Sequence, residues 1–376
     1  MFFCKRKHKT ESQLSAEERY FVATQWQLMW RKLIKHKLAM AGLFVLGCAY
    51  LAAVFCEFVA TNDIYKRHTE YIYCPPQQIH FFDDGEFHLR PFVYGIKTAR
   101  HPVTLRKIYA EDTSKRYPLE LLVPGADYRL WNLFSGNVHL FGVRDPGVFF
   151  LFGTDKLGRD VYSRTVYAAR ISLSIGLLGV ALSFVLGCAL GGISGFYGGS
   201  VDNLIQRVIE FLLSIPTIPL WMALAAAVPA GWPPLKTYFA ITIILSIVGW
   251  SGLARVVRGK LISLREEDYV LAAHIAGATS SRIIRRHLLP AFFSYLIVNL
   301  TLAIPGMILG ETALSFLGLG LREPVVSWGV LLNNAQDVTA VMLYPWLLIP
   351  GLFVIMAVLA FNFLGDGLRD AADPYS

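Results

Sequence analysis

Residues 171–197 read ISLSIGLLGVALSFVLGCALGGISGFY and contain no charged side chain. A helix needs roughly 20 consecutive apolar residues to cross the hydrocarbon core of a bilayer, so this stretch predicts a membrane-spanning helix. Five further apolar runs predict the other spans: 38–60, 211–235, 237–254, 291–310 and 338–365. Only the first of these five runs holds a charged residue, Glu57. The sequence therefore predicts an all-α polytopic membrane protein with six transmembrane helices.

The overall composition agrees with a membrane protein. Of the 376 residues, 55% are hydrophobic and 16% are charged, whereas soluble proteins carry about 25% charged residues. A net charge of +8 would suggest nucleic-acid binding only if the protein were a soluble fold with a basic face. Here the basic residues stand beside apolar runs, as in membrane proteins. We expect lipid, and no nucleic acid, as a partner.

The basic residues also predict an orientation. They are dense in residues 1–37 and again in residues 255–287. Six spans place both regions and the C-terminus on one side of the membrane. The positive-inside rule makes that side the cytoplasm. The predicted parts are a cytoplasmic tail (1–37), a first span (38–60), an extracytoplasmic insertion (61–152) and a core of five spans (153–376).

The structure of the tail and the fold class of the insertion each have two possible interpretations. Trp26, Met29, Trp30 and Leu33 follow helical spacing, so this stretch is either an amphipathic helix on the headgroups or an ordinary basic flank. The insertion mixes aromatic and charged residues and lacks the composition of disorder. It predicts a small folded module, β or mixed α/β, with a strand in residues 85–94.

The five cysteines have no CxxC spacing, so neither a metal site nor a disulfide framework is predicted. A pair between Cys56 and Cys74 stays open.

Glycines and prolines mark packing and bending positions in the spans. Gly187, Gly191 and Gly195 recur every fourth residue and predict a close helix–helix contact. Pro216, Pro219 and Pro305 remove backbone hydrogen bonds and permit kinks. Pro216 and Pro305 have two readings, a gated pathway or plain structure.

Residues 264–290, LREEDYVLAAHIAGATSSRIIRRHLLP, lie in the second basic region. Acidic residues up to Asp268 favour a helix start, Gly277 suits its end, and Ala272 and Ala273 lie between. A second short helix is expected, with Ser280 or Ser281 as its N-cap and Pro290 at its exit. The pair predicts a knob that can dock in a partner's groove; the alternative is a plain basic loop.

Several charges near the membrane have two readings each. Glu210 stands three residues after Arg207, which favours a local ion pair over a functional role. Glu311 either faces a pathway or fixes the following turn, and we favour the structural role. Asp155, Arg159 and Asp160 are placed at the outer mouth. Arg159 and Asp160 either contact a partner protein or close a gate there, or they form a local ion pair.

Residues 264–290 resemble the coupling-loop signature of binding-protein-dependent ABC permeases, with Ala272, Ala273, Gly277, Leu289 and Pro290 at matching positions. At Leu271 and His287 the sequence differs from the general signature, and both differences resemble those of the peptide-transport branch of the family. Four other stretches resemble C-type permeases of dipeptide, oligopeptide and nickel importers: GTDKLGRDVYSR (153–164), GFYGGSVD (195–202), ETALSFLGLG (311–320) and AFNFLGDGLRD (360–370).

The resemblance implies the MetI-like ABC permease fold in a bacterial inner membrane. It implies a B-type permease subunit as heterodimer partner, two ATPase subunits on the coupling loop and an extracytoplasmic substrate-binding protein. The sequence contains no GxxxxGK[ST] loop, so ATP and Mg²⁺ are expected on the ATPases and no cofactor, metal or catalytic residue on this chain.

Short peptides are the expected cargo, with oligosaccharides or nickel chelates as alternatives. A channel or secondary transporter is less favoured, because internal repeats and mid-membrane charges are missing. An intramembrane hydrolase would need an HExxH helix or paired aspartates, and Asp366 has no partner aspartate.

Overall fold

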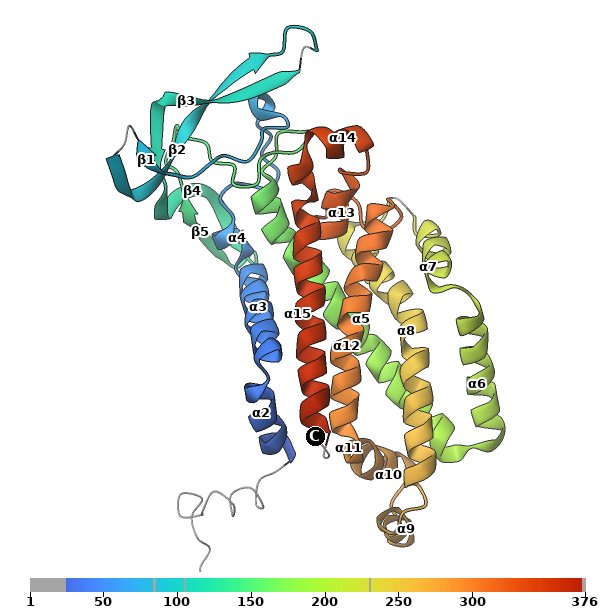
Figure 1. The fold of residues 1–376 in the computed structure, drawn as a ribbon. Helices are drawn as coiled ribbons and strands as arrows, with labels where there is room; N and C mark the ends of the chain where they lie inside the picture. The colour runs from blue at the N-terminus through green and yellow to red at the C-terminus, as the bar shows by residue number, and fades with distance from the viewer. Residues whose placement is uncertain (1–24, 84–85, 105, 230, 374–376) are drawn as a thin grey trace, which may run out of the picture.

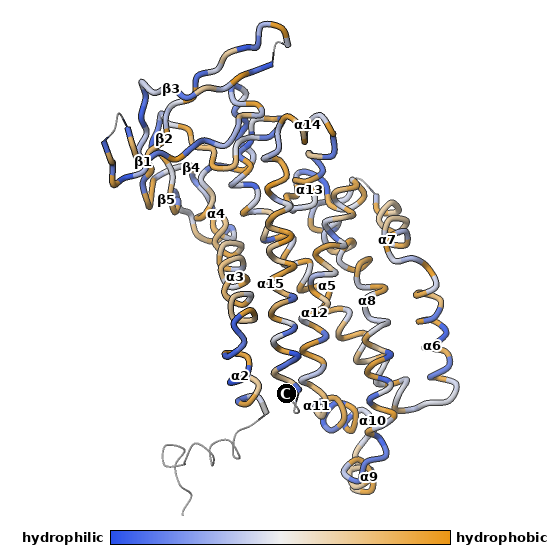
Figure 2. The backbone as a smooth tube through the Cα atoms, viewed as in Figure 1, coloured by the Kyte–Doolittle hydropathy of each residue, from blue (hydrophilic) through white to orange (hydrophobic). Residues whose placement is uncertain are grey.

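The computed structural model describes residues 25–83, 86–104, 106–229 and 231–373. Long helices form a bundle, and a module of strands covers one end of it (Figure 1). We call this end the insertion end, and the opposite end, where α9 (Asp268–Ile275) lies, the α9 end. Figure 2 shows that apolar residues dominate the bundle helices, whereas the strands alternate between polar and apolar residues.

Among the described residues, five helices are long and apolar enough to cross a membrane. They are α3 (Lys37–Val54), α5 (Val161–Tyr197), α8 (Pro234–Leu264), α12 (Phe293–Phe316) and α15 (Ile349–Ala372). A sixth span exists only if α6 (Gly199–Ser214) and α7 (Thr217–Ala226), which are bent by 88°, are taken together. The predicted helical class holds, and the count is five or six.

The predicted third span, residues 211–235, is wrong as one helix. The chain breaks between α6 and α7 because Pro216 has no N–H to donate and keeps the residue before it out of the helical region. Ile215 is accordingly extended, with φ −94° and ψ 129°. Helix α7 then ends at Ala226, and α8 begins at Pro234. Apolar composition predicted burial in lipid but could not place these breaks.

Other helix bounds also differ from the apolar runs. Helix α5 begins at Val161 because Asp160 caps it, accepting from the backbone N–H of Tyr162 and Ser163. Residues 255–264, predicted as loop, form the last turns of α8. The first span ends at Val54, and the short helix α4 (Cys56–Val59) follows. The last run divides into α14 (Val338–Leu343), a 3₁₀ turn (Pro345–Leu348) and α15.

The insertion is built from two antiparallel sheets. One has the order β1–β2–β3 and the other pairs β4 with β5. The strands are β1 (His80–Asp83), β2 (Glu86–Arg100), β3 (Lys107–Pro118), β4 (Glu120–Leu130) and β5 (Phe134–Gly142). The predicted strand at 85–94 falls in β2, apart from residue 85, which lies outside the described residues. A strand-containing insertion was expected, and Figure 1 shows it overhanging α3.

The tail residues 1–24 lie outside the described part of the chain. Helix α2 (Gln25–Lys35) follows them and divides the predicted amphipathic stripe. Met29 and Leu33 are buried against the end of α15, whereas Trp26 and Trp30 are about half exposed. Trp26 also meets Phe293 edge-on at a centroid distance of 5.7 Å. The stripe therefore serves partly as a packing face.

Cys56 and Cys74 are both free and buried. The disulfide left open by the sequence does not form.

Candidate functional site

Helix α9 stands alone at its end of the bundle, between α8 and the short helix α10 (Ser280–Ile283) (Figure 1). Asp268 supplies a negative charge in its first turn, where the helix dipole favours one. Val270 is its only fully buried residue and packs among the ends of α5, α8 and α12. Val270 anchors the helix, the partly buried Ala273 packs against the same cluster, and the rest of the helix projects outward.

Gly277 ends α9 in a Schellman arrangement. Its N–H donates to the carbonyl oxygen of His274 at 3.0 Å, and the N–H of Ala278 donates to that of Ala273, also at 3.0 Å. The φ of Gly277 is +79°, a left-handed conformation that glycine adopts without the steric cost that a Cβ brings. Gly277 therefore fixes where α9 stops and where the chain turns back.

The outward side of α9 is unusually apolar for an exposed helix. Tyr269 is 42% exposed, Leu271 51% and Ile275 88%. Ala272 is also exposed and small, and Ala273 is half-buried. Side chains of this kind form a shallow apolar knob that needs a partner surface to leave water.

The second short helix differs in detail from the prediction. Its N-cap is Thr279, not Ser280 or Ser281. It continues through a π-helical turn (Ile284–Leu288) into α11 (Leu289–Ala291). Pro290 therefore lies within the helical path and does not end it. Leu289 packs beside the buried cluster that holds Val270.

An ion pair joins α6 to α8 at the same end. Arg258 donates to both carboxylate oxygens of Asp202, each at 2.6 Å. The hydroxyl of Ser194 donates to the same carboxylate at 2.5 Å. Sequence reasoning counted Arg258 only as a loop charge and so missed this clamp. Nearby on α6, the predicted local pair of Arg207 with Glu210 is present at 2.7 Å.

The three spaced glycines of α5 lie against α8. A Cβ on Gly191 would stand 2.5 Å from the carbonyl oxygen of Ala254, and one on Gly195 would stand 2.7 Å from that of Arg258. A Cβ on Gly187 would stand 2.9 Å from Leu253. The two helices approach closely only because these side chains are missing.

Glu311 is fully buried on α12 and gathers three hydroxyl groups. It accepts from Ser315 at 2.8 Å, from Ser327 at 2.7 Å and from Ser172 at 3.3 Å. Ser172 belongs to α5, and Ser327 caps α13 (Trp328–Asn333). This arrangement favours the structural reading of Glu311.

Pro305 lies buried within the same helix, and α12 continues past it from Phe293 to Phe316.

At the insertion end, the loop before α5 is built around Asp155. One carboxylate oxygen accepts from the N–H of Leu157 at 2.8 Å and of Arg159 at 3.0 Å. Gly158 has a φ of +74°, and a Cβ there would stand 2.1 Å from the carbonyl oxygen of His68. Only glycine fits this turn, so the loop has one defined shape.

Arg159 and Asp160 do not pair with each other. Asp160 caps α5 and also accepts from the Thr61 hydroxyl at 3.2 Å. Burial raises the pKa of Asp160, against the hydrogen bonds from Ser163 that lower it.

Arg159 instead joins a cluster of four charges with Asp155, Arg164 and Glu323, which we call the ion cluster. Arg159 donates to Asp155 at 2.7 Å and to both Glu323 oxygens at 2.9 and 2.7 Å. Arg164 donates to Asp155 at 2.5 Å and to Glu323 at 2.8 Å. Hydrogen bonds from Arg159 and Arg164 and the positive charges of both side chains lower the pKa of Glu323 to about 2. The cluster ties the loop before α5 to the loop after α12.

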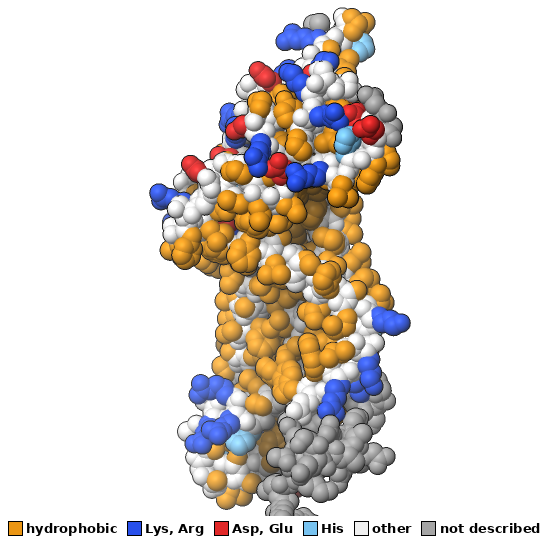
Figure 3. Space-filling view, turned by 90° about the vertical axis from the view of Figure 1, so that its left-hand side faces the viewer, with side chains coloured by type: hydrophobic (Ala, Val, Ile, Leu, Met, Phe, Trp, Pro, Cys, Tyr) orange, Lys and Arg blue, Asp and Glu red, His pale blue; other side chains and the backbone are white. Residues whose placement is uncertain are grey.

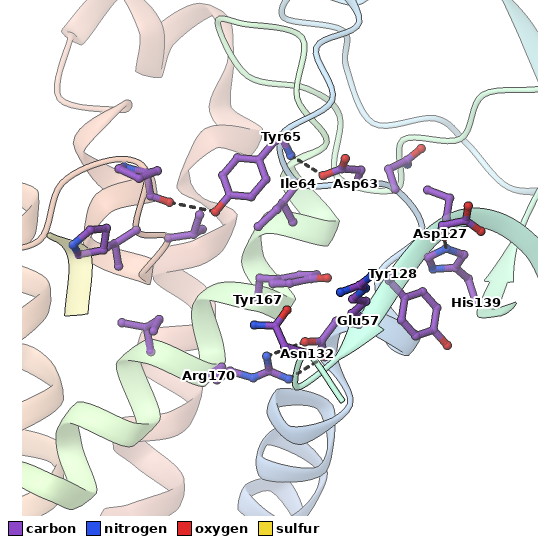
Figure 4. Close-up of a pocket in the computed structure, with 18 residues that line it drawn as sticks. Glu57, Asp63, Ile64, Tyr65, Asp127, Tyr128, Asn132, His139, Tyr167 and Arg170 are labelled. Atoms are coloured by element: carbon purple, nitrogen blue, oxygen red, sulfur yellow. Dashed lines mark hydrogen bonds and ion pairs between the residues drawn. The ribbon is translucent and has the colours of Figure 1, made fainter. Parts of the chain in front are cut away.

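A cavity of about 630 Å³ opens between the insertion and α5 (Figure 4). Tyr128 and Asn132 of the β4–β5 hairpin form one wall, and Tyr167 and Arg170 of α5 form another. Arg170 donates to both oxygens of Glu57 at 2.7 and 2.6 Å. Aromatic, polar and aliphatic side chains line the cavity, and they come from segments far apart in the sequence, which no local motif could have joined.

Within the described ranges, no group of three or more His, Cys, Asp or Glu side chains is placed to hold a metal ion.

Two family models match the chain. Residues 185–375 match the binding-protein-dependent transport system inner membrane component, and residues 24–76 match the N-terminal TM domain of oligopeptide transport permease C. Neither model spans residues 77–184, which include all five strands. The first model spans α9, Gly277 and Glu311.

Curated relatives are similar over most of their length. The dipeptide transport system permease protein DppC of Bacillus subtilis is 34% identical over 92% of this chain and 84% of its own. The oligopeptide transport system permease protein OppC of Haemophilus influenzae is 40% identical over 65% of this chain and 74% of its own. A solved structure of the inward-facing MetNI methionine ABC transporter matches at 19% identity and a TM-score of 0.43, over 55% of this chain and 95% of that chain.

Proposed function

Because this chain belongs to the family of binding-protein-dependent transport system inner membrane components, we propose that it is a permease subunit of an ATP-driven importer of short peptides. Its relatives DppC and OppC are permeases for dipeptides and oligopeptides, which supports peptides over oligosaccharides or nickel chelates. In this proposal the chain forms half of the translocation pathway, and a B-type permease subunit forms the other half.

The observation that carries the proposal is the apolar knob of α9. An exposed helix with Leu271 and Ile275 outward, rooted by Val270 and stopped by Gly277, is suited to seat in a groove of another protein. We assign that groove to an ATPase subunit. Two such subunits bind ATP and Mg²⁺, and this chain performs no hydrolysis itself.

The proposed orientation follows from the basic residues. The α9 end, with Arg282, Arg285 and Arg286 exposed beside the knob, faces the cytoplasm together with both termini. The insertion end then faces outward, where an extracytoplasmic binding protein delivers the peptide. Closure of the ATPases moves α9 as a rigid piece and tilts the spans between two states.

Replacing Ile275 with Asp tests the contact. The exposed side chain leaves the fold intact, while a carboxylate in an apolar groove weakens binding. We expect the complex from Ile275→Asp cells to lose its ATPase subunits on purification and to lose peptide uptake. The matched control is Leu89→Asp in the insertion, which is 86% exposed and should keep both. Full ATPase recovery and uptake with Ile275→Asp would reject the assignment.

A further inference from the structure

The β4–β5 hairpin ends in a group of exposed apolar residues. Three residues, 131–133, join the two strands, because Leu130 pairs with Phe134. Trp131 is 53% exposed, Leu133 78% and Phe134 69%. We call Trp131, Leu133 and Phe134 the hairpin tip. Large apolar side chains exposed together in water are energetically unfavourable, so a tip of this kind marks a contact surface.

The tip is fastened to the end of a membrane-spanning helix. The indole N–H of Trp131 donates to the carbonyl oxygen of Val54, the last residue of α3, at 3.1 Å. The guanidinium of Arg170 lies 4.3 Å from the centroid of the same ring. Trp131 has a φ of +53°, which is costly for a bulky side chain and persists only where neighbouring contacts fix it. The level of the tip along the bundle is therefore set by the end of α3.

Helix α3 presents a continuous apolar face up to that level. After Lys37, which begins the helix, its exposed positions carry neither charge nor hydroxyl. Gly47 and Val54 are among them, and the other six recur every three or four residues, the last just beyond the helix end: Leu38, Ala41, Phe44, Cys48, Leu51 and Phe55. Only 22% of its apolar window is buried, the lowest share among the five described spans. A face of this composition suits hydrocarbon.

Figure 3 shows that the insertion also has an apolar side and a charged side. Hydrophobic side chains line the lower margin of the insertion, directly above the apolar surface of the bundle, whereas charged side chains gather on the upper part. The exposed apolar residues of β4 and β5 also include Leu121, Leu122 and Val138. The underside of the insertion and the outer face of α3 thus border the same region.

We propose that the hairpin tip inserts into the headgroup layer of the membrane beside the end of α3 and holds the insertion down on the lipid surface. The proposal requires that the chain is embedded in a membrane, and it depends neither on the cargo nor on which side the insertion faces.

We assign lipid as the partner of the hairpin tip because of the apolar side chains around it and its level at the end of α3. A bilayer core is about 30 Å thick, and a helix of 18 residues such as α3 spans roughly 27 Å at 1.5 Å per residue. The end of α3 thus stands near the boundary of the hydrocarbon. Tryptophan with a bonded N–H and an exposed ring is typical of that boundary. Beyond Lys37, the exposed face of α3 offers no polar side-chain group except the Cys48 thiol, so it lacks the hydrogen bonds that a typical protein interface carries.

A fluorescent label that responds to water tests the proposal. We would label the full chain at Leu133→Cys in a Cys4→Ser, Cys48→Ala background, where the thiols of Cys56, Cys74 and Cys188 are buried. The labelled protein is placed in phosphatidylcholine nanodiscs, alone and in the complete importer. Val103→Cys, which is 83% exposed on the β2–β3 connection, is the matched control. Phe134→Cys provides a second tip position.

The expected result is that spin-labelled lipid removes most of the emission at 133 and 134, while aqueous iodide removes little. Position 103 should show the reverse. Strong iodide quenching at 133 would overturn the proposal, because the tip would then stand in water. Protection from both quenchers in the complete importer would overturn it as well, because a protein subunit would then cover the tip.

Discussion

Arg164 donates to Asp155 at 2.5 Å, with side chains only 2% and 4% exposed. Their charges have lost nearly all contact with water, so both depend on partners inside the ion cluster for compensation. The second terminal nitrogen of Arg164 donates to Glu323, which links the first turn of α5 to the loop after α12. The pair is the centre of the ion cluster, and two predictions follow from it.

Removing Arg164 should destabilise the chain strongly. Arg164→Ala leaves the buried carboxylate of Asp155 with Arg159 alone, and breaking a buried pair of this kind costs about 3–5 kcal/mol. Arg144→Ala is the control, because its pair with Glu120 is surface-exposed, with Arg144 69% exposed, and such pairs contribute about 0–1 kcal/mol. Thermal unfolding of the nanodisc-embedded protein measures both. Equal losses for the two variants would contradict the role given to the cluster.

The stability contributed by Glu323 should depend on acid pH. Its pKa is lowered from 4.5 to about 2 in the folded chain. A lowered folded pKa means that the contribution is complete above pH 4.5 and declines as the pH falls towards 2. Melting temperatures between pH 6 and pH 3 should therefore fall less steeply in Glu323→Gln than in the parent. Asp112, whose pKa Lys97 lowers to about 2, leaves a residual slope. Parallel curves for parent and variant would exclude this linkage.

Gly277 should be sensitive to backbone geometry rather than to space. A Cβ there meets nothing within 4 Å, but the φ is +79°. Valine in a left-handed conformation costs about 1–2 kcal/mol or more, so Gly277→Val should loosen the end of α9 and abolish peptide uptake while the subunit stays in the membrane. Asn tolerates this conformation better, and Gly277→Asn should retain part of the uptake. The measurement is peptide uptake divided by the amount of subunit on an immunoblot. If both variants take up peptide at the parental rate, the Gly277 cap is not needed for transport.

The contact between α5 and α8 should not tolerate one methyl group at Gly191. The added Cβ would stand 2.5 Å from a backbone carbonyl oxygen, and overpacking of this kind costs about 1–3 kcal/mol. Gly306→Ala on α12 is the control, because a Cβ there meets nothing within 4 Å, and alanine should stabilise that helix by about 0.5–1 kcal/mol. Melting temperatures of the two variants should move in opposite directions. A tolerated Gly191→Ala would show that the helices can separate.

The sequence predicted the features that depend on local pattern. Charge-free runs located the bundle helices, and the left-handed preference of Gly277 marked the end of α9. Helix breaks were harder, because the run 211–235 holds several prolines: Pro216 stands at the 88° bend, whereas Pro219 lies within α7. The early start of α5 was signalled by Asp160, an N-cap residue, but hydropathy does not register caps.

Contacts between distant segments could not be predicted. Nothing in the neighbourhood of Glu323 points to Arg159 and Arg164, which lie far earlier in the chain. The pairing of Arg258 with Asp202 could not be predicted either, because in the sequence Arg258 counts only as one of the basic residues that indicate orientation. A charge pattern records how many charges a segment carries, whereas the fold decides which of them meet.

Helix α5 has a mechanical consequence. Its 37 residues run unbroken from Val161 to Tyr197, about 55 Å at 1.5 Å per residue. One end holds Arg164 in the ion cluster, and the other holds Gly195 against α8. In an unbroken helix of this length, a tilt of a few degrees about the Gly195 contact would displace the far end by several ångströms.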